Sequence, residues 1–117
     1  MHNGIEIEYY VKTNGYTPVK EFIDSFNIKH QARIIREIEL LEIFGHELRE
    51  PHSKKLVNGI FELRINIDGN SIRLFYFFTE NQKAILTNGF IKKVQKTPER
   101  QIDTTIKFRN DFNKRNK

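Results

Sequence analysis

One β-hairpin constrains the fold of this chain more than any other segment. Phe61–Ile67 alternates apolar and polar side chains, as a strand with one buried face does. Asp68-Gly69 follows it directly and is a strong signal for a two-residue turn, and 71–79 is a second β-rich run. The sequence therefore predicts two antiparallel strands joined by a tight turn.

The turn also predicts which residues face each other. A two-residue turn at Asp68-Gly69 places Arg64 directly opposite Arg73, and a slip of two residues leaves the faces unchanged. The predicted core side carries Phe61, Leu63, Ile65, Ile67, Ile72, Leu74 and Tyr76. The opposite side carries Glu62, Arg64, Asn66, Arg73, Phe75 and Phe77.

The remaining segments complete an α+β domain. Alternation predicts strands over 5–11 and 83–91, and 46–53 reads as a loop. Apolar residues at helical spacing predict helices over 17–26 and 29–44, and a third from the Thr97-Pro98 start to about Asn113. We expect residues 1–117 to form a single domain with a small, four-stranded, mainly antiparallel sheet. An N-terminal αα-hairpin should cover one face, and a C-terminal helix follows.

Composition excludes several classes of site. The chain has no cysteine, which excludes disulfides, thiolate zinc sites and a cysteine nucleophile and fits a reducing cytoplasm. Its four histidines lack the spacing of four residues that a helical zinc site uses, so no metal or cofactor is expected. No apolar run approaches the ~18 residues that a membrane-spanning helix needs, and no secretory segment is evident. The expected location is the cytoplasm.

The positive charge is concentrated in the last quarter of the chain. Residues 92–117 hold 9 Lys and Arg against 3 Asp and Glu, whereas residues 1–91 hold 11 against 12. A concentrated basic segment favours nucleic acid, an anionic membrane or an acidic partner. A solvated tail is the other interpretation for Lys114, Arg115 and Lys117.

The predicted Arg64–Arg73 pair needs a compensating anion, because two like charges directly opposite each other repel. Glu62, diagonal to Arg73, could supply it as a structural ion pair. The alternative is an external phosphate held by two guanidinium groups. Phe75 and Phe77, on the same face, could stack on bases, or another segment could cover them. The candidate phosphate-binding groove also draws on Lys54, Lys55, Lys92, Lys93 and Lys96.

Several strings in the chain resemble one known toxin family. They are Lys54-Lys55-Leu56, Gly59–Arg64, Arg73–Tyr76 and Gly89–Pro98, together with Thr17-Pro18-Val19 and Glu21-Phe22. These strings resemble the HigB-like branch of the RelE/ParE toxin superfamily, over nearly the whole chain from about Ile5 to Phe112. The resemblance implies a RelE-like fold and the toxin of a type II toxin–antitoxin system.

The resemblance also implies an activity and partners. Such toxins are similar in being metal-independent mRNA endonucleases (mRNA interferases) that inhibit translation at the ribosome. A small helix-turn-helix antitoxin would be the partner, with operator DNA contacted only through it. The site residues it implies are Lys54, Lys55, Arg64, Arg73, Tyr76 and Lys93. One departure concerns Asn88, since relatives often carry a proton-transferring His before the Gly-Phe pair.

Chemistry suggests a role for each candidate. RNA can be cleaved by its own 2′-OH, so the protein must orient the substrate, move protons and stabilise charge. We expect Arg64 and Arg73 to stabilise the phosphate, and Lys54, Lys55, Lys93 or Tyr76 to carry acid–base work. Lys92, Lys96, Phe75 and Phe77 are expected to bind RNA.

Two other functions stay open at this point. The chain could be a binding module of the same fold without useful nuclease activity, which contacts operator DNA or a partner with its antitoxin. It could also be a purely structural basic protein.

Overall fold

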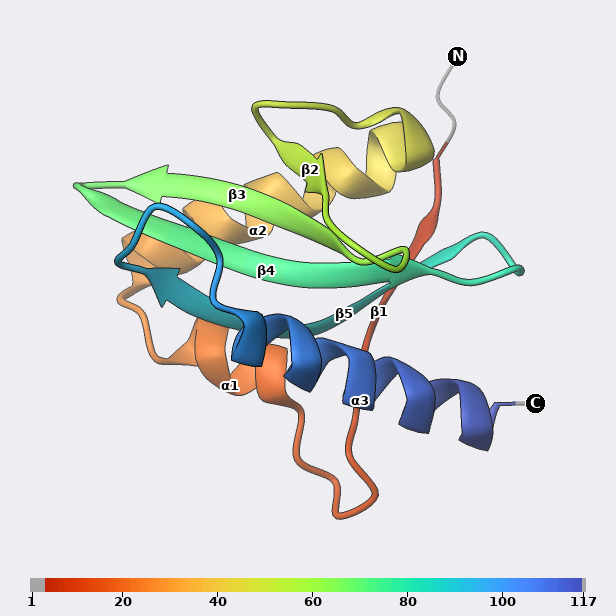
Figure 1. Ribbon diagram of the computed structural model, residues 1–117. Helices are drawn as coiled ribbons and strands as arrows, with labels where there is room; N and C mark the ends of the chain where they lie inside the picture. Colours follow the sequence, from red (N-terminus) through yellow and green to blue (C-terminus); the bar gives the residue numbers. More distant parts are fainter. Residues whose placement is uncertain (1–3, 117) are drawn as a thin grey trace.

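The fold is built on a twisted five-stranded sheet with helices on both faces (Figure 1). A computed structural model describes residues 4–116. The strand order is β1-β5-β4-β3-β2, and the strands are β1 (Glu6–Tyr9), β2 (Ser53–Lys55), β3 (Phe61–Ile67), β4 (Asn70–Phe78) and β5 (Lys83–Lys92). β1 pairs with β5 in parallel and the other neighbours pair antiparallel, so the sheet is mixed.

The β3–β4 hairpin has the predicted register. Arg64 lies opposite Arg73, and Ile67 lies opposite Asn70 across the turn. The residues predicted for the core side do pack there: Leu63, Ile65, Ile67, Ile72, Leu74 and Tyr76 are buried, with Phe61 against them. Arg64 and Arg73 therefore share the opposite face, as the alternation of side chains requires.

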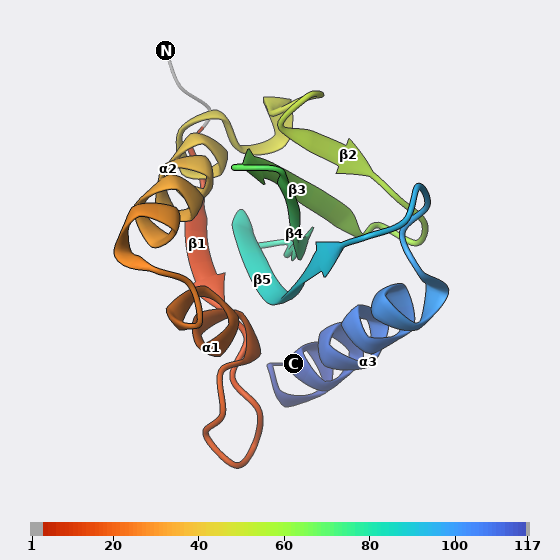
Figure 2. The same ribbon diagram turned by 90° about the vertical axis from the view of Figure 1, so that its left-hand side faces the viewer.

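The helices divide between the two faces of the sheet. α1 (Pro18–Asp24) and α2 (Ile28–Phe44), followed by a short 3₁₀ turn (Gly45–Glu47), cover one face, and α3 (Glu99–Arg115) crosses the other (Figure 2). The core on the α1–α2 side includes Val19, Ile23, Ile34, Ile38 and Leu41. The smaller core under α3 includes Tyr10, Ile60, Phe75, Phe77 and Ile85. α3 leaves the part of its face near β2 and the end of β5 uncovered (Figure 2).

Three expectations about the elements were wrong. The sheet has five strands rather than four, because 53–55 forms a short edge strand that begins at the last residue of the predicted loop. The sheet is mixed rather than mainly antiparallel, because β1 joins its far edge in parallel with β5. α3 continues to Arg115 rather than ending near Asn113. The Arg115 guanidinium binds Asp111 at 2.8 Å and the Val11 carbonyl at 2.5 Å, which ties down the last helical turn.

Gly89 in β5 allows α1 to pack closely against the sheet. A Cβ atom at this position would lie 2.6 Å from Leu74 Cδ2 and 2.6 Å from Phe22 Cδ2. We expect Gly89→Ala to lower the free energy of unfolding by about 1–3 kcal/mol, the usual cost of overpacking a core. Gly4→Ala is the matched control, because its Cβ would meet its nearest atom at an ordinary 3.4 Å. Equal denaturation midpoints for the two variants would contradict this account.

Candidate phosphate-binding site

Four cationic side chains gather on the uncovered part of the α3 face around one buried carboxylate. We call this group the Glu62 cluster: Lys54 from β2, Glu62 and Arg64 from β3, Arg73 from β4 and Lys92 from β5. Strand pairing brings them together, because Lys54 lies opposite Glu62, Arg64 opposite Arg73, and Lys92 opposite Ser71, two residues before Arg73. Their side chains consequently project from the same side of three adjacent strand pairs.

Glu62 is the centre of the cluster. Its side chain is about 1% exposed, and burial of a carboxylate requires partners for its charge. Thr97 donates a hydrogen bond to Oε1 at 2.8 Å. Arg64 Nε donates to Oε2 at 3.2 Å, and Arg73 Nε lies 3.7 Å from the same oxygen. The predicted compensation of the arginine pair by Glu62 is thus confirmed.

Arg73 remains incompletely satisfied. The residue is only 7% exposed. Among the residues that the structure describes, its Nε is the one buried side-chain nitrogen or oxygen without a hydrogen-bond partner. Burial lowers the pKa of the Arg73 guanidinium; Glu62 opposes this effect and Arg64 adds to it. An arginine stays charged in proteins, so a buried cation with a free N–H is left facing the cluster.

The charges of the cluster do not balance within it. Four cations surround one central carboxylate, that of Glu62. A second carboxylate, that of Glu50, lies 3.2 Å from the Arg64 guanidinium, but its side chain is exposed to solvent. Burial lowers the pKa of the Lys92 ammonium; Glu62 opposes this, and Arg73, Arg64 and Lys54 each lower it further. The three neighbouring cations thus make the site electropositive, which favours binding of an anion with several oxygens.

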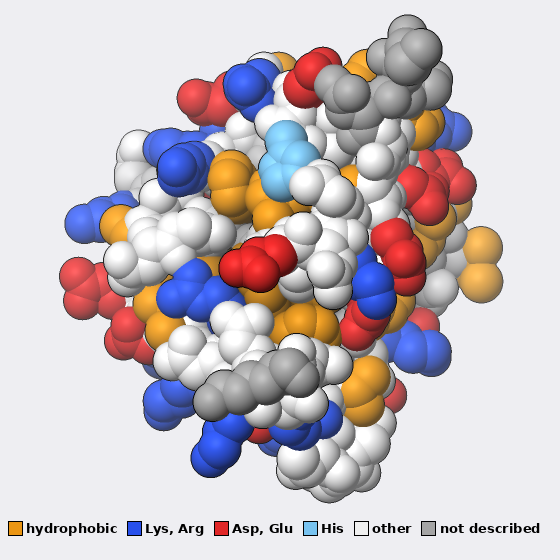
Figure 3. Space-filling model, turned by 90° about the vertical axis from the view of Figure 1, so that its right-hand side faces the viewer, with side chains coloured by type: hydrophobic (Ala, Val, Ile, Leu, Met, Phe, Trp, Pro, Cys, Tyr) orange, Lys and Arg blue, Asp and Glu red, His pale blue; other side chains and the backbone are white. Residues whose placement is uncertain are grey.

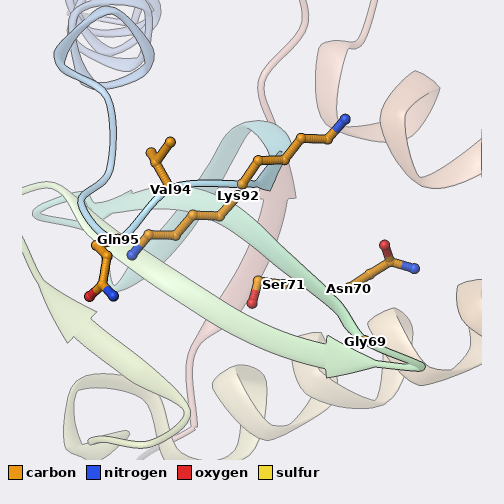
Figure 4. A pocket seen from close by; sticks show the side chains of 7 residues that line it. Gly69, Asn70, Ser71, Lys92, Val94 and Gln95 are labelled. Carbon is orange, nitrogen blue, oxygen red and sulfur yellow. The ribbon is translucent and has the colours of Figure 1, made fainter.

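Two hollows meet at this cluster. The inner pocket, of about 340 Å³, has Lys54, Lys92 and Lys96 among its lining residues, together with Leu56, Val57 and Ile102. The outer trough, of about 530 Å³, lies beside the β3–β4 turn and is lined by Gly69, Asn70, Ser71 and residues 92–95 (Figure 4). Lys92 and Gln95 line both hollows, so the two lie next to each other, and we call the pair the groove. The opposite end of the molecule carries acidic, basic and apolar side chains intermixed (Figure 3).

Four predicted residues, Lys55, Phe75, Phe77 and Tyr76, lie away from this groove. Lys55 lies opposite Phe61, which packs on the α1–α2 side, so the pair Lys54-Lys55 splits between the two faces. Phe75 and Phe77 lie on the predicted face but are buried beneath α3, where Phe77 meets Phe112 edge-on with 5.7 Å between ring centroids. Their rings are therefore not available to stack on a base. The alternative prediction, that another segment covers these two residues, is confirmed.

Tyr76 is buried on the far face of the sheet. Its hydroxyl forms a short hydrogen bond with Ser53 Oγ, and burial raises its pKa to about 12 while the bond to Ser53 opposes that rise. A phenol in this environment is a poor proton donor or acceptor near neutral pH. The expected acid–base role of Tyr76 therefore has no support in this geometry.

Asn88 has a structural role. It is buried beneath α3, and its Oδ1 accepts a hydrogen bond from Thr105 at 2.9 Å. The position that often carries His in resembling toxins therefore connects the sheet to the helix in this chain.

Sequence reasoning missed two features of polar residues. Thr97 precedes Pro98 and looked like a helix cap, but its hydroxyl binds Glu62 and holds the segment after β5 over the sheet. Glu37 of α2 is buried and binds Arg33 at 2.6 Å and His52 at 2.7 Å. A signal for Glu37 existed in the i, i+4 spacing from Arg33, which allows an ion pair.

The described part of the chain holds neither a metal-binding cluster nor a membrane-spanning helix. Within 4–116, no three His, Asp or Glu side chains gather closely enough to hold a metal ion. No helix in the same range is both long and apolar enough to cross a membrane.

Comparison with known proteins gives one family. No curated protein matches the chain significantly. The sequence profile of the phage-derived, Gp49-like proteins (DUF891) matches residues 21–109, which include the Glu62 cluster and most of α3. That family consists in general of toxins of toxin–antitoxin systems. The chain, with its small α+β fold and its cationic groove, belongs to the Gp49-like family of phage-derived proteins.

Proposed function

We propose that this chain is the toxin of a type II toxin–antitoxin system and that it cleaves mRNA on the ribosome. The fold would then be RelE-like and the chain a member of the HigB-like branch. The observation that carries the proposal is Arg73, a buried cation with an unused N–H in a cluster whose positive charges exceed its carboxylates. A phosphate of the RNA backbone would supply the negative charge that Glu62 alone does not provide to the four cations around it.

The proposed reaction uses the substrate's own nucleophile. The 2′-OH of one nucleotide loses its proton and attacks the adjacent phosphorus, and the bond to the 5′ oxygen of the next nucleotide breaks. That oxygen takes up a proton, which leaves a 2′,3′-cyclic phosphate and a 5′-OH end. The transition state gathers negative charge on the phosphate oxygens, so fixed cations lower its free energy more than that of the ground state. No metal is needed for these steps.

The geometry suggests a role for each side chain of the cluster. Arg73 and Arg64 are held by Glu62 and would contact the phosphate oxygens. Lys54 adds charge from the edge strand. Lys92, expected only to bind RNA, becomes the preferred candidate for proton transfer, because its lowered pKa brings an ammonium closer to the working pH. Lys93 and Lys96 would bind RNA along the groove.

The proposal includes the partners of the toxin. In the cytoplasm its targets would be mRNA and the ribosome, and a small helix-turn-helix antitoxin would neutralise it. Operator DNA would be reached only through that antitoxin.

A binding module without nuclease activity is the second candidate function. Two observations favour it: Asn88 is buried and bound to Thr105, and Tyr76 lies on the far face with its pKa raised to about 12. Neither residue can move protons at the cluster. Such a module would contact operator DNA or a partner together with its antitoxin.

The two candidate functions, nuclease and binding module, predict different outcomes when the chain is mixed with ribosomes that carry an mRNA. We expect the purified chain to cut an mRNA of defined sequence within the reading frame when ribosomes are present, leaving cyclic phosphate and 5′-OH ends. We also expect growth arrest with blocked translation when the chain is expressed alone. An intact message at protein concentrations above that of the ribosomes, with binding retained, would favour the module.

A further inference from the structure

The groove has two chemically different walls. Lys54, Lys92 and Lys96 provide a cationic wall, while Leu56, Val57 and Ile102 provide an apolar one on the same inner pocket. Val57 is 54% exposed. A single exposed valine needs no explanation. Here, however, three apolar side chains line one pocket together with lysines that could bind a phosphate. The two walls suit the two parts of a nucleotide, the base and the phosphate. Bases have apolar faces, and phosphates carry the charge.

The apolar wall is held in place by its own hydrogen bonds. Leu56 N–H donates to the Ile60 carbonyl at 2.8 Å, and Ile60 N–H donates to the Val57 carbonyl at 3.0 Å. Arg109 of α3 donates to the carbonyl of Asn58 in the same turn. This wall is therefore a fixed surface joined to both β3 and α3, and a base could pack on it without a loop having to order first.

The third side of the pocket carries a hydrogen-bonding amide. Gln95 lines both the inner pocket and the outer trough, on the segment that Thr97 holds to Glu62. A glutamine amide presents a donor and an acceptor, which suits the edge of an unpaired base.

We propose that the groove holds two consecutive nucleotides of a single RNA strand, with one base packed against Leu56, Val57 and Ile102. The phosphate between the two nucleotides then lies at Lys54 and Lys92, which line the inner pocket beside the buried Arg73, and the strand continues over the outer trough past Lys93. This inference rests on the proposed function and adds to it a base-binding subsite. It makes Val57 and Gln95 specificity-determining residues, and it requires an unstacked base, so paired nucleic acid does not fit.

Binding of two uncleavable probes tests the subsite. One is a short single-stranded RNA with 2′-fluoro sugars, and the other has the same backbone without bases. We expect Val57→Asn to weaken binding of the first probe about tenfold, within the range for loss of one base contact. Binding of the base-free probe should not change, and the salt dependence should stay the same because no phosphate contact is lost.

Val11→Asn is the matched control, since Val11 is 42% exposed and lies outside the groove; it should bind both probes as the unaltered chain does. The subsite is overturned if Val57→Asn binds the base-containing probe with unchanged affinity, or if it loses equal affinity for both. If the unaltered chain binds neither probe, the subsite fails, whereas the proposed function is decided separately by cleavage of mRNA on programmed ribosomes. If it binds RNA as described but does not cut it, only the nuclease proposal fails.

Discussion

Arg73→Ala is expected to abolish toxicity and to slow cleavage of ribosome-bound mRNA about 10²- to 10³-fold. That range is typical for removal of one preorganised donor to a developing oxyanion. Arg73 has the position for this effect, because its guanidinium is buried beside Glu62 with an unused N–H. Arg73→Lys should recover only part of the rate, since lysine keeps the charge but not the two-pronged geometry.

The control for Arg73 is a cation elsewhere in the chain. Lys114 is exposed near the C-terminal end of α3, at the opposite end of the helix from the segment that Thr97 holds to Glu62. Lys114→Ala should leave the single-turnover rate nearly unchanged. The Arg73 variant should also stay folded, because Arg64 and Thr97 still hold the Glu62 carboxylate and the repulsion with Arg64 is removed. Undiminished cleavage by a folded Arg73→Ala protein would contradict the site.

Glu62→Gln should have the largest effect on stability, a loss of about 3 kcal/mol in the free energy of unfolding. Removing one partner of a buried ion pair typically costs about 3–5 kcal/mol, because the other charge is left uncompensated. Here the variant would leave Arg64, Arg73 and Lys92 facing one another without their carboxylate. Glutamine keeps an oxygen for the Thr97 hydroxyl, so the change isolates the charge.

Inorganic phosphate should restore part of this lost stability. An anion that binds the folded state shifts the unfolding equilibrium in proportion to its occupancy, and the variant has one more charge to neutralise. Glu50→Gln is the matched control: Glu50 is exposed and reaches Arg64 at 3.2 Å, and exposed pairs contribute about 0–1 kcal/mol. Denaturant titrations with and without phosphate measure both effects. Equal losses in the two variants would show that Glu62 does not balance the cluster.

The sequence predicted the part of the site that depends on local geometry. A two-residue turn and a period of two fix the register of β3 against β4, so the pairing of Arg64 with Arg73 followed from Asp68-Gly69 alone. The alternation also placed Glu62 beside both arginines. These features need no knowledge of the rest of the chain.

The features that the sequence did not predict depend on contacts between segments that are far apart in the chain. β2 has only three residues and lies at the sheet edge, so its sequence is too short to show the alternation that predicts a strand. Phe75 and Phe77 lie at alternate positions of β4, on the same sheet face as Arg73, so the pattern alone placed them in the site. Only the path of α3 shows that they are buried. Thr97 carries a cap signal, yet its partner Glu62 is distant in the sequence. The parallel pairing of β1 with β5 likewise leaves no local trace.

The most direct test of the central claim is a single 2′-deoxy substitution in the mRNA at the mapped cut. If the substrate's 2′-OH is the nucleophile and the Glu62 cluster supplies positioning and charge, that one change should abolish cleavage at that bond. Binding of the message to the ribosome and the toxin should stay the same, and neighbouring bonds with their 2′-OH should still be cut. Cleavage of the 2′-deoxy bond at an undiminished rate, with a 3′-OH end, would contradict the account.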